Sequence, residues 1–140
     1  MTPERIFGIA NAIALVSWIL LAIFPGKEWV RKGITTTIVP SLFAGLYAAI
    51  VATVFGRAAG GFSTLTDVGR LFANPWMLLA GWVHYLAFDL RTGSWEVDDA
   101  RKRGIPHALV IPCLVLTFLF GPAGWLLYRI VAAKAGTKLT

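Results

Sequence analysis

Two histidines and two aspartates in the second half of the chain have the types and spacing that acid–base chemistry requires. His84 and Asp89 lie at the end of one apolar stretch, and Asp99 and His107 lie around the start of the next. The sequence contains no other histidine. Ionisable groups within membrane helices are costly and usually serve a function. We therefore predict that the two imidazoles face each other at a similar depth across a helical hairpin.

Imidazoles and carboxylates in one place support two kinds of chemistry. They supply a general acid and a general base near neutral pH. The predicted catalytic residues are therefore His84, His107, Asp89 and Asp99. The same four side chains are ligand types for Zn, Fe or Mn, so a divalent metal cofactor is an open alternative. No H-E-x-x-H motif, Gly-rich phosphate loop or Ser-centred elbow occurs, so zincin, nucleotide-binding and serine-hydrolase functions have no support.

Structural roles compete with these functions. His84 and Asp89 are about 140° apart on an ideal helix, so they cannot both point at one spot unless the helix end unwinds. Asp89 could pair with Arg91 or Arg103 instead, and Asp99 could cap or stabilise a helix start. The two histidines could also form a structural hydrogen-bonded pair.

Four apolar stretches would position these residues. Hydrophobic residues make up 57% of the 140 residues, charged residues make up 14%, and the mean hydropathy is +0.71. This composition is typical of an integral membrane protein and excludes disorder. A spanning helix needs about 20 mostly apolar residues. We predict an all-α protein with one domain over residues 1–140 and a charged connection at 89–103. Its four transmembrane helices are expected at approximately 6–26, 34–56, 73–90 and 105–130.

Turn-forming residues predict where these helices are interrupted. Residues 57–70 are rich in Gly, Ala, Ser and Thr. They should form a loop that ends in a short interfacial helix opened by Asp67, before the turn at Asn74. Gly121 and Pro122 could break the fourth helix into two pieces.

Two further patterns bear on how the helices are arranged. Arg-Lys-Gly-Ile at 31–34 has a counterpart, Lys-Arg-Gly-Ile, at 102–105, which suggests two parallel-repeat helical hairpins. Basic residues and glycine are also common where a helix enters the membrane, without any repeat. Ala44, Ala48 and Ala52 share one helix face, which allows close helix packing in lipid, and a homodimer is a further expectation.

The charge balance points to lipid as a partner. Thirteen Lys and Arg against seven Asp and Glu give a net charge of +6. In so apolar a chain this excess indicates a membrane surface rather than nucleic acid. We therefore expect membrane lipid and a hydrophobic small molecule as partners, and no nucleic acid. The single cysteine, Cys113, supports neither an internal disulfide nor a multi-cysteine metal site.

The stretch from about residue 74 to residue 128 resembles a known family. The resemblance rests on Asn74-Pro75, Trp82, His84, Phe88-Asp89-Leu90, Gly93, Trp95, Asp99-Ala100, Gly104-Ile105-Pro106-His107, Pro112, Leu116-Thr117-Phe118 and Gly121-Pro122-Ala123-Gly124. This ordered set resembles the abscisic-acid-deficient-four-like membrane proteins. That family is named from the plant plastid protein required to make neoxanthin from violaxanthin. The first half of the chain resembles it only in having two hydrophobic spans.

The resemblance implies a four-helix membrane protein of carotenoid or isoprenoid conversion. Turning a 5,6-epoxide into an allenic alcohol removes one proton from the polyene and protonates the epoxide oxygen, without redox change. A positioned acid and base would suffice for these two transfers. The substrate-binding residues expected near them are Trp82, Asn74, Phe88, Trp95 and Arg103. The first span starts near residue 6 with no plastid transit peptide before it, so we expect a bacterial-type member in a bacterial inner membrane.

Three functions are consistent with these patterns. The first is a membrane enzyme with isomerase- or lyase-type acid–base chemistry on a hydrophobic, carotenoid-like isoprenoid. The second is a small membrane transporter or proton-coupled carrier, which the kinking prolines and the repeat suggest. The third is a non-catalytic membrane partner protein, which the small-residue face suggests. Polar residues concentrate in the second half of the chain, which favours an enzyme or a metal site over a carrier.

Overall fold

The chain folds into helices around one long central helix. The computed structural model describes residues 1–136, and that range contains no β-strand. The elements are α1 (Pro3–Ile23), the π-helix η1 (Trp29–Ile38), α2 (Val39–Val54), the 3-10 turn η2 (Phe55–Arg57), α3 (Leu65–Phe72), α4 (Pro75–Lys102), α5 (His107–Phe120) and α6 (Pro122–Gly136). The predicted all-α class is confirmed.

The first two predicted spans are helices of membrane-crossing length. Helix α1 has 21 residues, and η1, α2 and η2 join into one helix of 29 residues, Trp29–Arg57. Both are long and apolar enough to cross a membrane, and no other helix within residues 1–136 meets that test. Four transmembrane helices are therefore not confirmed. Helix α1 begins at Pro3 because the Thr2 hydroxyl caps it by accepting a hydrogen bond from the Arg5 backbone N–H.

The third predicted span is the first part of a much longer helix. Helix α4 begins as expected, because the side chain of Asn74 accepts hydrogen bonds from two backbone N–H groups of the first turn. It then runs for 28 residues instead of ending near Asp89. Charged residues sustain its last turns through pairs four residues apart, such as Asp99 with Arg103. Asp89 consequently lies near the middle of α4.

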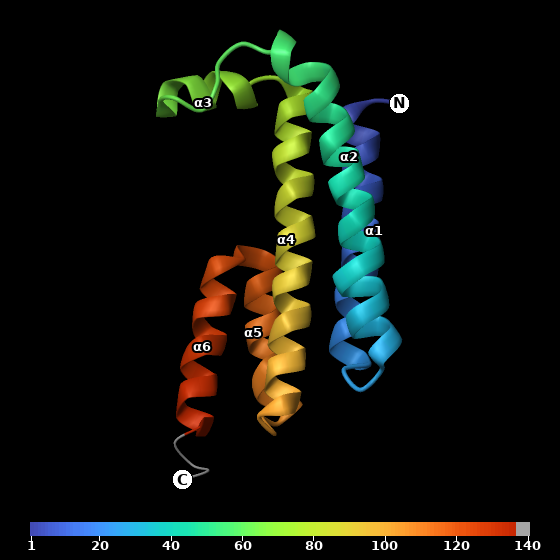
Figure 1. The fold of residues 1–140 in the computed structure, drawn as a ribbon, viewed down its shortest axis with the longest axis vertical. Helices are drawn as coiled ribbons and strands as arrows, with labels where there is room; N and C mark the ends of the chain where they lie inside the picture. The colour runs from blue at the N-terminus through green and yellow to red at the C-terminus, as the bar shows by residue number, and fades with distance from the viewer. Residues whose placement is uncertain (137–140) are drawn as a thin grey trace.

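The prediction of a single fourth span over residues 105–130 is wrong. Helices α5 and α6 form an antiparallel hairpin (Figure 1), with 14 and 15 residues respectively. Gly121 reverses the chain with a φ of +39°, and Pro122 then starts α6. The pair does break the helix, as the sequence suggested. As a result, the chain leaves α6 at the end of the molecule opposite the N-terminus (Figure 1).

In each half of the chain the first helix runs down and the next runs up, as two parallel hairpins would, but the halves differ in helix length (Figure 1). In the first half, α1 is followed by a helix of 29 residues. In the second half, α4 is followed by two short helices, of which α5 has half as many residues as α4. The similar motifs at 31–34 and 102–105 therefore precede different structures.

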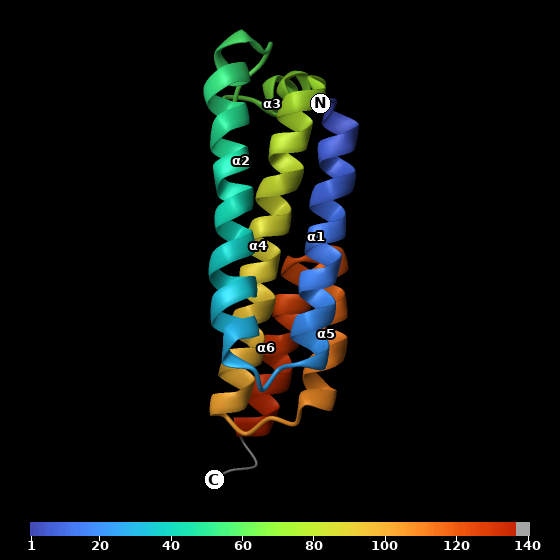
Figure 2. The same ribbon diagram turned by 90° about the vertical axis from the view of Figure 1, so that its right-hand side faces the viewer.

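Helix α4 forms the centre of the molecule. Helices α1 and α2 pack on one side of it, and the α5–α6 hairpin packs along its lower half on the other side (Figures 1 and 2). Val83 and Leu90 are fully buried in this core. A Cβ added to Gly93 would lie 2.4 Å from the Trp18 ring, so this glycine allows α1 to approach α4 closely.

Helix α3 lies crosswise at the upper end of the molecule (Figure 1). The Thr64 hydroxyl caps it by accepting a hydrogen bond of 3.1 Å from the Asp67 backbone N–H, so the helix starts slightly before the predicted position. The hairpin reaches only about half-way up α4 from the other end. On that side, within the described chain, the upper half of α4 contacts only α3, through Phe72 beside Gly81, and the hairpin tip, through Tyr85.

The face of small residues on α2 makes no close packing contact within the described chain. Ala44, Ala48 and Ala52 are all exposed. A Cβ added to the neighbouring Gly45 would have no atom within 4 Å.

Candidate functional site

Asp89 lies opposite the tip of the α5–α6 hairpin. A Cβ added to Gly121 would lie 2.7 Å from Asp89 Oδ1, so the carboxyl group and the tip are in contact. Asp89 Oδ2 is buried and has no hydrogen-bond partner among the described residues. Buried polar atoms are nearly always hydrogen-bonded, which makes this oxygen a candidate functional atom. A pocket of about 310 Å³ is lined by Asp89, Thr92, Gly121, Pro122 and Trp125.

Two glycines let the hairpin tip approach α4. The positive φ of Gly121 is a conformation that residues with side chains rarely adopt. Gly124 packs directly on α5, where an added Cβ would lie 2.0 Å from the backbone nitrogen of Thr117. Both belong to the Gly-Pro-Ala-Gly motif at 121–124. The motif therefore positions the backbone that faces Asp89.

Tyr85 lies one helical turn before Asp89 on the same face of α4. Its hydroxyl donates a hydrogen bond of 3.0 Å to the Leu119 carbonyl at the hairpin tip. Its side chain is also in electrostatic contact with the Asp89 carboxylate. The sequence analysis missed Tyr85, although its spacing of four residues from Asp89 places both side chains on one helix face.

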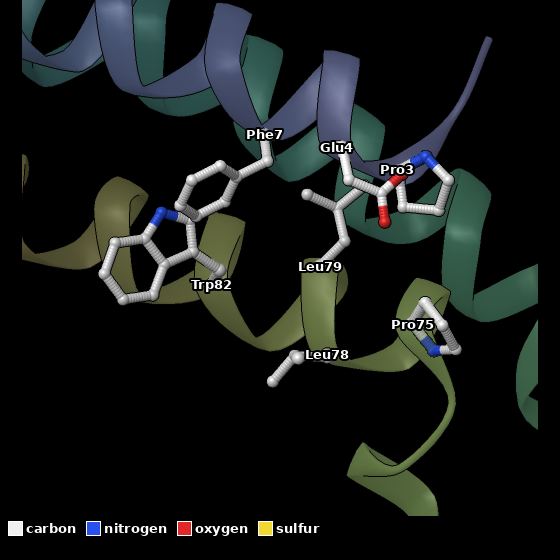
Figure 3. Close-up of a pocket in the computed structure, with 7 residues that line it drawn as sticks. All are labelled: Pro3, Glu4, Phe7, Pro75, Leu78, Leu79 and Trp82. Carbon is white, nitrogen blue, oxygen red and sulfur yellow. The ribbon is translucent and has the colours of Figure 1, made fainter.

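Trp82 lies between Tyr85 and a second pocket. Its ring stacks on Tyr85 with a centroid distance of 5.3 Å, and its indole N–H donates a hydrogen bond of 2.8 Å to Asn11 Oδ1. Phe7 packs on its other side at 5.5 Å. The pocket beyond it, drawn in Figure 3, has a volume of about 280 Å³. It is lined by Pro3, Glu4, Phe7, Pro75, Leu78, Leu79 and Trp82.

Four of these residues form one continuous row, here called the α4 stripe. Leu78, Trp82, Tyr85 and Asp89 follow one another at spacings of three or four residues, so they share one face of α4. Leu78 is 57% exposed and Trp82 is 39% exposed. The stripe connects the pocket in Figure 3 with the pocket at the hairpin tip. It offers an apolar, aromatic surface that ends at a carboxyl group.

His84 lies away from the α4 stripe. It is exposed, and its ring contacts Tyr47 of α2 at a centroid distance of 5.5 Å and Phe88 at 4.9 Å. The angle of about 140° between residues five apart on a helix accounts for this separation from Asp89. The helix end would have to unwind to bring them together, and α4 continues without a break.

His107 lies at the far end of the molecule from His84, so the predicted convergence of the two imidazoles is wrong. His107 starts α5, and its Nε2 makes a hydrogen bond of 2.8 Å with the Ala22 carbonyl of α1. The prediction placed Asp89 at the membrane boundary. Helix α4 instead continues to Lys102, close to where His107 starts α5. About 27 Å of helix therefore separates His84 from the end of α4. The structural hydrogen-bonded pair does not form either.

Asp99 and Arg103 join the lower ends of α4 and α6. Asp99 Oδ2 accepts hydrogen bonds from the Tyr128 hydroxyl at 2.6 Å and from Arg103 Nε at 2.7 Å. About 15 Å of helix separates Asp99 from Asp89, so the two carboxylates do not share a site. Asp89 itself has no ion pair among the described residues, neither with Arg91 nor with Arg103.

The remaining predicted substrate-binding residues lie beside the α4 stripe. The side-chain oxygen of Asn74 is used to cap α4. Phe88 and Trp95 are 59% and 41% exposed and line a shallow pocket with Trp125. Trp125 also lines the pocket of Asp89, so the shallow pocket of Phe88 and Trp95 adjoins the site.

Glu96 is a buried acid that the sequence analysis missed. It is 0% exposed, and the Thr117 hydroxyl of α5 donates a hydrogen bond of 2.9 Å to its Oε1. The residue fell in the predicted connection at 89–103. Its seven-residue spacing from Asp89 was the available signal, because that spacing returns to the same face of a helix.

The predicted metal site does not form. Among residues 1–136, no three His, Cys, Asp or Glu side chains lie close enough together to hold a metal ion. The four predicted ligands are dispersed over α4 and the start of α5. They are His84, Asp89, Asp99 and His107. The alternative of a Zn, Fe or Mn centre built from this set therefore has no support within residues 1–136.

Comparisons with known proteins agree with the resemblance seen in the sequence. A family model described as ABA DEFICIENT 4-like matches residues 5–128. The match extends beyond the stretch at 74–128 to include α1 and α2. No curated protein and no solved structure matches the chain.

Proposed function

The chain belongs to the ABA DEFICIENT 4-like family, and from this membership we propose that it is a membrane enzyme that isomerises a carotenoid-like isoprenoid. The family is associated with carotenoid and neoxanthin-related function. The proposed reaction is a rearrangement by proton transfer, with no change in redox state. Lyase-type chemistry on the same substrate class would use the same proton transfers.

One observation carries the proposal. The Asp89 carboxyl group has a buried oxygen without a partner, and it lies at the end of an aromatic row. A carboxyl group can act as either proton acceptor or proton donor. Tyr85, one helical turn away on the same face, adds a second exchangeable proton, which its hydroxyl donates to the Leu119 carbonyl in this structure.

The α4 stripe supplies the surface for a long, flat, apolar substrate. From Leu78 to Asp89 it extends over about 16 Å of helix. The faces of Trp82 and Tyr85 stack on each other with an interplanar angle of 28°. A planar polyene gains dispersion and apolar burial along such a surface. Its reactive ring would then lie at the hairpin tip.

For a 5,6-epoxide, the proposed steps balance without a redox partner. The Asp89 carboxylate removes a proton from a carbon of the polyene. The electron pair of that C–H bond forms the new double bond as the C–O bond of the epoxide breaks. Tyr85 donates its hydroxyl proton to the oxygen, and the proton held by Asp89 then restores Tyr85. The product is an allenic alcohol with the same atoms as the substrate.

We also propose how the chain sits in the membrane. Helix α1 and the helix Trp29–Arg57 would cross it, as their length and composition allow. Helix α4 would cross between them, since its 28 residues extend for about 42 Å. The α5–α6 hairpin would enter and leave on the same side. Such a re-entrant hairpin is tolerated where its tip packs against protein, as Gly121 does against Asp89.

The direct test is conversion by the purified protein in lipid nanodiscs. A 5,6-epoxycarotenoid is the substrate, and chromatography with absorption spectra detects the product. Asp89→Asn should lower the rate at least about 100-fold, because general acid–base catalysis contributes about that much or more. Glu28→Gln is the matched control, because Glu28 is exposed and paired with Lys32 away from the α4 stripe.

Tyr85→Phe tests the second proton. It should lower the rate while substrate still binds, because only the hydroxyl is lost. Tyr47→Phe is the matched control, and its rate should equal that of the unchanged protein. Full activity of Asp89→Asn would remove the basis of the proposed mechanism.

A proton-coupled carrier is a second candidate. Broken, half-length helices that face buried acids are typical of transporter binding sites. Here the hairpin faces Asp89 and Glu96. The carrier would be favoured if proteoliposomes show a proton flux and if Glu96→Gln abolishes this flux. Absence of any flux, with conversion intact, would favour the enzyme.

A further inference from the structure

A third pocket lies at the opposite end of the hairpin from Asp89. It has a volume of about 470 Å³ and lies between the start of α5 and the end of α6. Arg103 and Lys134 supply two cations to its lining, and Ile105, Leu109 and Val131 supply apolar walls. The pocket is separate from the α4 stripe and shares no lining residue with the pockets there.

The two cations have capacity for a further partner. Arg103 uses its Nε–H for Asp99, at 2.7 Å, and no ion pair within residues 1–136 engages its terminal amino groups. Lys134 forms no salt bridge with any described residue. Together these groups match a phosphate, since guanidinium and ammonium groups both bind phosphate oxygens.

The apolar walls distinguish a lipid from a free anion. Leu109 is 50% exposed, although it belongs to this pocket. An inorganic phosphate gains nothing from such a surface. An acyl chain packs against such a surface through many van der Waals contacts, as lipid tails do along membrane helices. Cations above an apolar wall are therefore the arrangement that a phospholipid requires.

We propose that this pocket binds one anionic phospholipid, with its phosphate between Arg103 and Lys134 and an acyl chain along Leu109 and Val131. The inference rests on the proposed membrane location but not on the proposed reaction. Its position agrees with the charge distribution. The same end carries Lys27, Arg101 and Lys102 in addition to Arg103 and Lys134, although Lys102 is paired with Asp98. The α3 end carries three basic residues, Arg5, Arg57 and Arg70, and Arg70 is paired with Asp67. Basic residues at one end attract anionic lipid.

The test is lipid binding by the purified full-length protein, followed by native mass spectrometry after addition of defined lipids. Phosphatidylglycerol should bind at least about fivefold more tightly than phosphatidylcholine, because one cation near a membrane surface contributes about that factor. Lys134→Ala should remove most of this preference, and Lys134→Arg should retain it. Lys27→Ala is the matched control, because Lys27 is exposed and lies outside the pocket.

Two further measurements distinguish a phospholipid from free phosphate, and a specific cation from general surface charge. Leu109→Gln should weaken phosphatidylglycerol binding and leave competition by inorganic phosphate unchanged. The proposal is overturned if inorganic phosphate at millimolar concentration displaces the lipid completely. It is also overturned if Lys27→Ala weakens binding as much as Lys134→Ala does, because the effect would then be general surface charge. None of these measurements depends on carotenoid conversion, so a failed isomerase assay leaves this test intact.

Discussion

The two halves of α4 differ in how their side chains are held. Residues 89–102 pack with buried polar partners, such as Glu96 with Thr117 and Asp98 with Arg31 at 2.7 Å. Residues 75–88 pack mainly through apolar and aromatic groups, and Leu78 remains 57% exposed.

The difference follows from the length of the hairpin. Helices α5 and α6 cover only the lower half of α4, and they bring hydroxyl groups that satisfy its buried acids. The upper half has no such cover on that side. Asp89 lies where the cover ends, so it is buried by the tip but receives no hydrogen bond at Oδ2. The candidate site therefore arises from the boundary between the two halves.

The largest effect on the difference between the two halves of α4 is expected when the hairpin is forced apart. Gly124→Ala should destabilise the protein by about 3 kcal/mol or more, because the new Cβ would lie 2.0 Å from the Thr117 backbone. The free energy of unfolding in mixed micelles measures the effect. Conversion of the epoxycarotenoid should be lost as well, since Asp89 would lose its contact with the tip.

Gly45→Ala is the control for a glycine-to-alanine change. Gly45 has no atom within 4 Å of an added Cβ and lies inside α2. Alanine should therefore stabilise the protein by up to about 1 kcal/mol through helix propensity. Equal stability of both variants would contradict the close packing of the hairpin.

The buried polar contact of the lower half can be tested by a double-mutant cycle. Thr117→Val should cost about 1–3 kcal/mol, because Glu96 would be left buried without its partner. Glu96→Leu combined with Thr117→Val should recover most of that loss, since both polar groups are then removed. Chemical unfolding of the unchanged protein, of Thr117→Val and Glu96→Leu alone, and of the double variant gives the coupling energy.

Thr53→Val serves as the matched control for the loss of a hydroxyl. Thr53 is exposed and bonds only within its own helix, so its replacement should change stability by less than about 0.5 kcal/mol. Additive effects of the Glu96 and Thr117 changes would show that the two side chains do not act as a pair.

Local chemistry explains which parts of the fold the sequence predicted. The start of α4 and the break at Gly121 were both correct, because a capping Asn and a Gly-Pro pair act on the backbone directly. The end of α4 was wrong because absence of charge was used to mark it. Helix hydrogen bonds continue through charged residues, and salt bridges sustain them. The reversal after Gly121 depends on packing against α4, which no local pattern contains.

The candidate site was predicted only in part for the same reason. Asp89 and Trp82 were singled out as polar or aromatic groups in an apolar stretch. Tyr85 and Glu96 were missed because their partners, Leu119 and Thr117, come from the reversed hairpin. The pairing of the two histidines failed because their depth was counted from the wrong helix end.

The smallest change in stability is expected on the open half of α4. Leu78→Ala should alter the free energy of unfolding by less than about 0.5 kcal/mol, because Leu78 is 57% exposed. Leu114→Ala, at a position of α5 that is only 2% exposed, should cost about 2–5 kcal/mol and provides the contrast. Binding of the epoxycarotenoid should reverse this order. Leu78→Ala should weaken it about fivefold, since the substrate would cover that side chain. If Leu78→Ala left the affinity unchanged, the upper α4 stripe would not be the substrate surface.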